Sequence, residues 1–164
     1  MSDSPNLDTS VSVMLLRMQH KELLVPKAMM ADVLSWKQQL FSAQKAQSAW
    51  KLGQYEWRDW RIPLVCFESL IEPSFERQPM QKSKVVVLRS FQKGFEDDHY
   101  GLLCRGFPKP LILGERSMEN LHVESNQDWI KYSISIGNRI LDVPDFAALQ
   151  GAVWAAPELL SYSA

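Results

Sequence analysis

Residues 50–63 read WKLGQYEWRDWRIP and place three tryptophans and two arginines within fourteen positions. This amount of aromatic surface beside fixed positive charge allows three interpretations. The stretch is a stacking platform for nucleic acid, an ordinary buried hairpin, or a hairpin whose arginine contacts a protein partner. The rest of the sequence decides among them.

The composition argues for one globular domain and against a polyanion as partner. The 164 residues are 46% hydrophobic, which suits a folded domain with a real core. Lysine and arginine number 18, aspartate and glutamate 19, and the net charge is -1. Nucleic-acid-binding domains usually carry a basic excess on one face. The charge balance therefore weakens the first interpretation.

The two cysteines and the apolar runs indicate a reducing compartment. Cys66 and Cys104 each lie in an apolar run and have neither a paired nor a metal-type spacing, which predicts reduced thiols in the core. The polar, acidic N-terminal stretch does not resemble a secretory signal. No apolar run approaches the roughly 20 residues needed to span a bilayer. We therefore expect a cytoplasmic protein without direct membrane insertion.

The first part of the chain predicts a mobile tail followed by a strand pair. Residues 1–10 are polar and are expected to form the tail. Residues 11–18 predict a strand, with a turn and a short partner strand at 23–26. The segment 28–47 is ambiguous: its alanine, methionine and leucine content favours a helix, whereas Met30, Val33 and Trp36 could line a strand after Pro26. The residues alone leave both possibilities open.

The remainder of the chain is predominantly β, with one helix near its end. Runs rich in β-branched and aromatic residues predict strands at 54–58, 61–67, 84–91 and 100–107, the first two around a turn at Asp59-Trp60. Pro108 and Pro110 suit an edge strand, and Gly137-Asn138 predicts a hairpin within 129–143.

A helix is expected to begin between Asp142 and Asp145, with Pro144 at an early position. Phe146, Leu149, Val153 and Trp154 recur in it at helical spacing, and Pro157 ends it. The sequence thus predicts a mainly β, barrel-type domain with a short C-terminal helix.

No residue set in the sequence has the spacing of a catalytic or metal site. The three histidines fall in predicted turns or loops, and phosphate-loop, zinc and nucleophile-elbow motifs are absent. Glu56 and Asp59 could act as an acid/base pair, but hairpin carboxylates are usually solvent-facing. Trp57 and Arg58 are adjacent, so on a strand the tryptophan would face the core and the arginine the surface. We therefore expect a non-enzymatic protein with no cofactor, no metal and no nucleic-acid partner.

The same hairpin resembles the signature of CheW-like domains. Gly53, Arg58 and Pro63 match that signature in register, whereas Glu56 and Asp59 stand where the family usually has asparagine and glycine. Other parts agree in order along the chain, from about residue 11 to 155. They are the Asp32-Val33 strand, the strand 100–106 with Arg105 in place of an acidic residue, and the closing strand and helix 139–149.

The resemblance implies two small, five-stranded SH3-like barrels packed into one CheW-like domain. It places this domain at 11–155, between a tail at 1–10 and a tail at 156–164, and it makes 28–34 extended. It also implies a non-enzymatic adaptor that links methyl-accepting chemoreceptors to a CheA-type histidine kinase, in the cytoplasm at receptor complexes of the inner membrane. The run 57–68 most resembles adaptors of chemosensory systems that control type IV pili. The alternative from another class is a small β-barrel that binds nucleic acid.

By resemblance, the receptor docks on a groove near Met30, Asp32, Gly53 and Arg58, and the kinase on a different, more apolar surface. An arginine beside a turn offers a rigid fork of donors to a partner. The alternative is that Arg58 pairs only with Glu56 or Asp59 on the surface, which would contribute less than about 1 kcal/mol.

Overall fold

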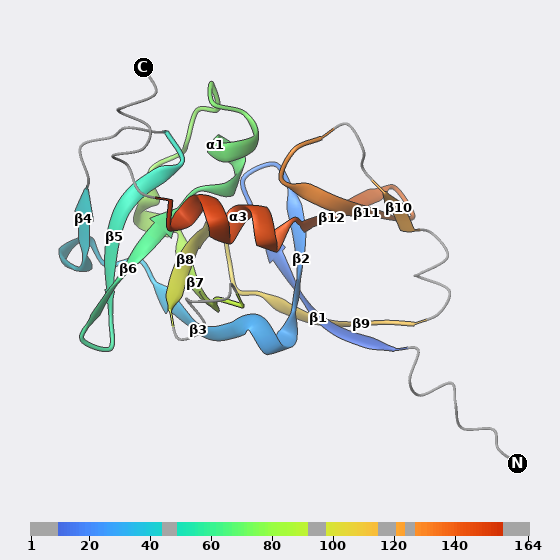
Figure 1. The fold of residues 1–164 in the computed structure, drawn as a ribbon, viewed down its shortest axis with the longest axis horizontal. Helices are drawn as coiled ribbons and strands as arrows, with labels where there is room; N and C mark the ends of the chain where they lie inside the picture. The colour runs from blue at the N-terminus through green and yellow to red at the C-terminus, as the bar shows by residue number, and fades with distance from the viewer. Residues whose placement is uncertain (1–9, 44–48, 92–97, 115–120, 124–126, 156–164) are drawn as a thin grey trace, which may run out of the picture.

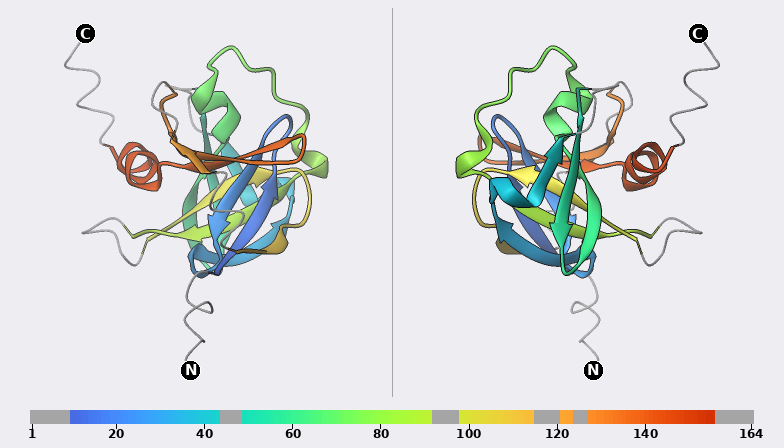
Figure 2. Two further views of the ribbon diagram at one scale, coloured as in Figure 1. Left: turned by 90° about the vertical axis from the view of Figure 1, so that its right-hand side faces the viewer. Right: turned by 90° about the vertical axis from the view of Figure 1, so that its left-hand side faces the viewer.

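The computed structural model describes residues 10–43, 49–91, 98–114, 121–123 and 127–155. Two β-sheets lie next to each other, and helix α3 (Phe146–Val153) crosses in front of them (Figure 1). Figure 2 shows that α3 lies to one side of both sheets rather than between them. The predicted tails, apart from Ser10, and the predicted helix end at Pro157 lie outside the described residues.

The first sheet joins the two ends of the domain. Its strands, in spatial order, are β10 (Leu121–Val123), β11 (Ile130–Ile136), β12 (Arg139–Pro144), β2 (Glu22–Pro26), β1 (Val11–Arg17) and β9 (Lys109–Leu113). The parallel pair β12–β2 connects the C-terminal hairpin to the N-terminal one. The predicted hairpin at Gly137-Asn138 is confirmed, with a positive φ of 61° at the glycine. β9 is an edge strand, as its prolines predicted.

The second sheet contains the middle of the chain. Its order is β3 (Met30–Ser35), β7 (Lys84–Arg89), β8 (His99–Cys104), β6 (Trp60–Val65), β5 (Lys51–Trp57) and β4 (Phe41–Ala43). Each sheet has five strands of at least five residues and a three-residue strand at one edge. The mainly β fold in two subdomains is therefore confirmed, with a sixth short strand added to each expected set of five.

An apolar cluster between the sheets holds the two subdomains together. Because side chains alternate along a strand, each sheet contributes one face to this layer. We call it the shared cluster; its fully buried members include Leu16, Leu23 and Val25 of the first sheet and Val86, Leu88, Tyr100 and Leu102 of the second. The opposite faces bury separate clusters around Leu24 and Leu141 in the first sheet and Tyr55 and Leu64 in the second. The domain therefore has a core in each subdomain and a third between them.

Helix α3 closes one side of the shared cluster. Asp145 caps it by accepting a hydrogen bond from the backbone N–H of Ala148 at 3.1 Å, and Leu149 and Val153 are buried. Inside, the Gln150 amide donates to the Tyr100 hydroxyl at 3.3 Å. The predicted helix is confirmed, but Pro144 ends β12 instead of opening the helix. Pro144 is the last residue of this strand and lies opposite Ile130 in the β11–β12 pair.

The ambiguous segment is extended and not helical in its described part, 28–43. A short 3₁₀ turn (Lys27–Met29) leads into β3, and a second one (Gln38–Leu40) leads into β4. The Tyr55 hydroxyl fixes the end of β3, because it donates to the Ser35 carbonyl at 3.1 Å and accepts from Lys37 N–H at 2.9 Å. Tertiary contacts therefore override the helical propensity. The extended conformation that the resemblance implied for residues 28–34 is observed from Met30 onwards, whereas Ala28 and Met29 belong to the 3₁₀ turn.

The β5–β6 hairpin turns one residue earlier than expected, at Arg58-Asp59. Both residues have positive φ, 48° and 66°, as in the tight two-residue turns whose twist matches that of the flanking strands. The predicted strand at 61–67 is also too long. It ends at Val65, and helix α1 (Phe67–Ile71) follows.

Both cysteines are free and buried, which confirms the expected core thiols. Burial raises the pKa of the Cys104 thiol well above its usual range.

Glu68 in α1 ties the second subdomain to the first. Its buried carboxylate accepts the backbone N–H groups of Gln19 and His20, each at 2.7 Å, in the turn between β1 and β2. The Gln19 amide continues this contact by donating to the Glu76 carbonyl at 3.1 Å and accepting from Gln78 N–H at 2.9 Å. The β1–β2 turn of the first subdomain is thus held by α1 and the loop after it, which connect β6 to β7 in the second subdomain.

We expect Glu68→Gln to lower the free energy of unfolding by about 1–3 kcal/mol, because an amide NH₂ would face one of the two backbone N–H groups whose hydrogen bonds the carboxylate accepts. Urea denaturation followed by circular dichroism measures the change. Glu72→Gln, at an exposed position one turn later, is the matched control and should leave stability within about 0.5 kcal/mol. A Glu68 variant as stable as this control would show that the carboxylate does not join the subdomains.

Asp59→Gly should leave the melting midpoint unchanged or raise it slightly, because glycine adopts a positive φ without the cost of about 1 kcal/mol that a side chain imposes. Thermal unfolding is the measurement. A loss above about 1 kcal/mol would mean that the Asp59 carboxylate itself stabilises the hairpin.

Candidate protein-docking site

Asp32 on β3 is the centre of a polar cluster at the tip of the β5–β6 hairpin. Its Oδ2 accepts a hydrogen bond from Trp57 Nε1 at 2.9 Å, and its Oδ1 accepts from the backbone N–H of Val33 at 2.8 Å. The same Oδ2 lies 3.8 Å from a guanidinium nitrogen of Arg58. β3 and β5 are not neighbours in the order of the second sheet, so these contacts join strands from opposite halves of that sheet. We call Asp32, Trp57 and Arg58 the Asp32 cluster.

Arg58 lies on Trp57 and faces the solvent. Its guanidinium carbon is 4.9 Å from the centroid of the Trp57 ring, and its side chain is 67% exposed. Trp57 itself is 8% exposed and contacts His99, with ring centroids 4.7 Å apart. The predicted core role of Trp57 is confirmed. Arg58 lies in the turn and has a left-handed backbone conformation. Its guanidinium therefore lies over the Trp57 ring and not on the opposite face of the strand.

The ion pair of Arg58 is long and exposed, so it leaves most donors of the guanidinium available. Exposed pairs of this kind contribute at most about 1 kcal/mol. Within the described part of the chain, the carboxylate paired with Arg58 is that of Asp32 and not that of Glu56 or Asp59. The alternative pairing considered from the sequence is therefore wrong. The arrangement offers a partner an arginine held by an aromatic ring and a carboxylate.

The other two candidate residues lie at different places. Met30 is on β3 with Asp32, separated from it by a β-bulge, opposite Leu88, and packs partly buried against the shared cluster. Gly53 lies four residues before Trp57 on β5, roughly 13 Å away at the usual strand rise. Its φ of 150° favours glycine, and a bulge precedes it. The structure thus brings Asp32 and Arg58 into contact, with Met30 along the same strand and Gly53 towards the other end of the hairpin.

Trp60 is the surface residue that the sequence reasoning missed. It is opposite Trp57 across the turn and is 67% exposed, which is unusual for a tryptophan. Trp60, Arg61 and Trp154 are among the residues that line a hollow of about 100 Å³ beside the Asp32 cluster. A signal was present in the residue types. Trp60 and Arg61, both exposed at the start of β6, are of the two types that are enriched where interfaces are strongest.

The described residues carry no recognisable catalytic arrangement. Within them, no three histidine, cysteine, aspartate or glutamate side chains are grouped closely enough to hold a metal. His20 packs edge-on against Phe75, with ring centroids 5.7 Å apart. Among the described residues, no helix has both the length and the apolar character needed to cross a membrane. What the Asp32 cluster can do chemically is hydrogen-bond, pair charges and stack.

The comparisons with known proteins agree with the two-sheet fold. The fold is similar to that of the scaffolding protein TtCheW from Thermoanaerobacter tengcongensis, with a TM-score of 0.62 at 10% sequence identity. The likeness covers 82% of this chain and 88% of that one. No curated protein matches significantly. The family model of the CheW-like domain matches residues 12–152, and the chain therefore belongs to the CheW-like domain family.

Proposed function

We propose that the protein is a non-enzymatic adaptor that couples methyl-accepting chemoreceptors to a CheA-type histidine kinase. Family membership supports the adaptor role, and the similar fold of a protein described as a scaffold supports it further. The adaptor is cytoplasmic, associates with receptor complexes at the inner membrane, and uses residues 11–155 as its folded domain. The resemblance of residues 57–68 to pilus-associated adaptors supports control of type IV pili as its output.

The observation that carries the docking proposal is the Asp32 cluster. A guanidinium held over a buried tryptophan and next to a carboxylate is preorganised, so less side-chain entropy is lost when a partner binds it. Met30 adds apolar surface on the same strand, and Trp60 adds an exposed aromatic ring on the other side of the turn. We propose that the receptor's helical tip docks on this surface, with Met30, Asp32 and Arg58 at its centre and Gly53 at its border.

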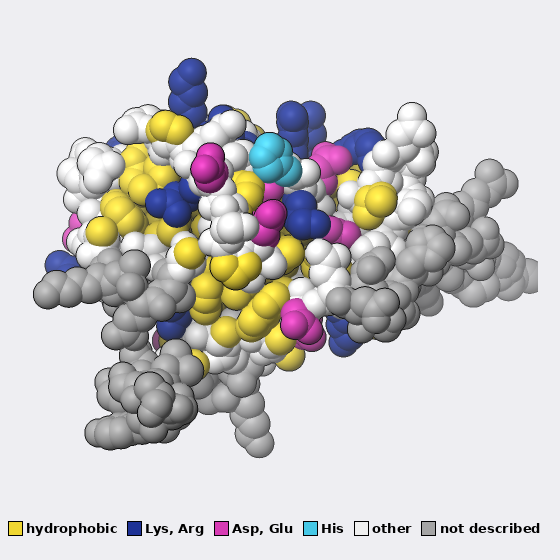
Figure 3. All heavy atoms as spheres, turned by 90° about the horizontal axis from the view of Figure 1, so that it is seen from above, with side chains coloured by type: hydrophobic (Ala, Val, Ile, Leu, Met, Phe, Trp, Pro, Cys, Tyr) yellow, Lys and Arg dark blue, Asp and Glu magenta, His cyan; other side chains and the backbone are white. Residues whose placement is uncertain are grey.

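The exposed ring of Trp60 is a feature that the nucleic-acid alternative would use, but the rest of the hairpin does not fit that alternative. Single-strand binders stack bases on exposed aromatic rings along a basic groove. Trp57 is buried, and Arg58 pairs with a carboxylate. On the face shown in Figure 3, which is turned away from the tip of this hairpin, positive and negative side chains are also intermixed. A pull-down from cell lysate should therefore recover a receptor or kinase and no nucleic acid.

We expect Arg58→Ala to fold with a melting midpoint close to that of the parent, since the side chain is largely exposed, yet to bind the receptor tip at least about tenfold more weakly. Tenfold corresponds to roughly 1.4 kcal/mol. The receptor affinity of Arg58→Lys should lie between those of the parent and Arg58→Ala, because lysine keeps the charge but lacks the planar fork of donors. Isothermal titration with a receptor tip fragment measures the affinity.

Arg77→Ala, an exposed arginine in the loop after α1, is the matched control and should bind as the parent does. Kinase binding by Arg58→Ala should change less than receptor binding, since we assign the kinase to a different surface. If the folded Arg58→Ala variant binds both partners as the parent does, Arg58 is only a surface charge.

A further inference from the structure

A second polar surface lies at one end of the first sheet, away from the Asp32 cluster. Arg17 lies opposite Glu22 in the β1–β2 register, and Lys109 lies opposite Leu15 in the β9–β1 register. By strand alternation these residues share the face of Leu15 and Leu24, which belong to the sheet's own apolar cluster. Arg139 joins them from β12, two residues before the buried Leu141. We call Arg17, Glu22, Lys109 and Arg139 the cationic mouth of the first subdomain.

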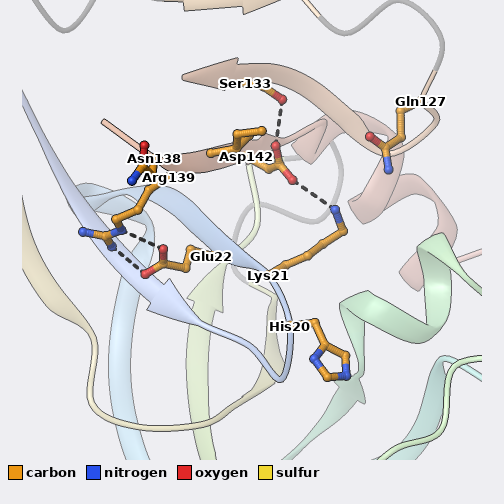
Figure 4. Close-up of a pocket in the computed structure, with 9 residues that line it drawn as sticks. His20, Lys21, Glu22, Gln127, Ser133, Asn138, Arg139 and Asp142 are labelled. Atoms are coloured by element: carbon orange, nitrogen blue, oxygen red, sulfur yellow. Dashed lines mark hydrogen bonds and ion pairs between the residues drawn. The ribbon is translucent and has the colours of Figure 1, made fainter. Parts of the chain in front are cut away.

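The carboxylates at this place are already neutralised. Glu22 accepts two hydrogen bonds from Arg139, at 2.9 Å from Nε and 2.5 Å from the terminal nitrogen, as Figure 4 shows. The hydrogen bond from Arg139 and the positive charges of Arg139, Arg17 and Lys109 lower the pKa of Glu22. Beside it, the buried Asp142 accepts from Ser133 at 2.7 Å and pairs with Lys21 at 3.2 Å.

This pairing leaves an excess of two positive charges. Four fixed cations, Arg17, Lys21, Lys109 and Arg139, line the surface together with two carboxylates, Glu22 and Asp142. Glu22 forms an ion pair with Arg139, and Asp142 forms one with Lys21. Arg17 and Lys109 are exposed and form no ion pair with any residue in the described ranges. The excess is local, because the whole chain carries a net charge of -1.

The surface is also hollowed. Two open hollows of about 500 and about 520 Å³ meet here and share His20, Lys21, Glu22 and Arg139 in their walls. Leu15 and Met18 are among the few apolar residues that line the second hollow, which extends to Lys109. Openings at the ends of β-barrels are common places for ligands. A surface that is concave and has unpaired cations suits an anionic partner.

We propose that the cationic mouth binds an acidic segment of a partner protein, with carboxylates of that segment pairing with Arg17 and Lys109. An extended segment fits because the hollows run from Lys109 on one edge strand, past Arg139, to the β11–β12 turn. The described lining contains neither a helix N-terminus nor a glycine loop, the features that cradle phosphate. Guanidinium groups match carboxylates well, as the Arg139–Glu22 pair shows within the same mouth. This surface goes beyond the receptor docking proposed above and lies on the other sheet.

Fluorescence anisotropy with a labelled hexaglutamate peptide tests the proposal. The parent protein should bind the peptide at low salt, with an affinity that falls as salt is added, because exposed charges are screened. The double variant Arg17→Gln/Lys109→Gln should bind at least about tenfold more weakly while keeping the parent's melting midpoint. The double variant Lys37→Gln/Arg61→Gln removes the same charge from exposed positions of the second subdomain and should bind within about twofold of the parent.

Three results would overturn the proposal. The first is no binding by the parent at low salt up to about 1 mM peptide. The second is equal weakening by the two double variants, which would indicate net charge instead of a site. The third is inorganic phosphate competing as strongly as unlabelled hexaglutamate, which would assign the mouth to phosphate. The proposal of an acidic segment is supported if unlabelled hexaglutamate competes and phosphate does not, and if only the Arg17→Gln/Lys109→Gln variant loses peptide binding.

Discussion

The apolar layer between the two sheets is the constraint on which the rest of the structure depends. Leu16, Leu23 and Val25 of the first sheet are fully buried against Val86 and other residues of the second. Burying such a side chain contributes about 1.5–3 kcal/mol to stability. Separating the subdomains would expose several of these side chains and lose their contributions together. The apolar residues on both faces of these strands follow from this layer, because each sheet must present one apolar face to the other and keep a second for its own core.

Polar contacts then fix how the two subdomains meet. The Glu68 carboxylate holds the β1–β2 turn, and α3 covers the shared cluster from the side through Leu149 and Val153. At the far end of the second sheet, Asp32 holds Trp57, and Trp57 supports Arg58. Hydrogen bonds to charged groups contribute about 1.5–3 kcal/mol, more than an exposed ion pair does. The cluster is therefore held mainly by the buried tryptophan and leaves its arginine available for binding.

Much of the fold could be predicted from local patterns, and the exceptions have physical reasons. Gly137-Asn138 and Asp145 act over a few residues, so a hairpin and a helix cap were predictable there. The extended path of 30–35 depends on the distant Tyr55 hydroxyl, which no local propensity reports. Helix α1 was missed because Phe67 continues an apolar run that reads as a strand.

The candidate site was predictable only in part. The sequence resemblance pointed to Asp32 and Arg58, and the structure places them in contact. It could not show that Trp57 connects these two residues, because its indole N–H donates to Asp32 and its ring supports Arg58. The exposure of Trp60 depended on the exact position of the turn, which the sequence analysis placed one residue too late. The cationic mouth depends on strands distant in sequence, β1, β2, β9 and β12, and had no local signal.

The central claim is that the Asp32 cluster is where a receptor docks, and the indole N–H of Trp57 reports on it directly. The six tryptophans give six indole signals in a proton–nitrogen correlation spectrum, and Trp57→Phe assigns the one that matters. When a receptor tip fragment is added, we predict that the Trp57 signal shifts or broadens. The signal of Trp36, buried further along the second sheet, should stay in place. A complex that forms while the Trp57 signal remains unchanged would contradict this account.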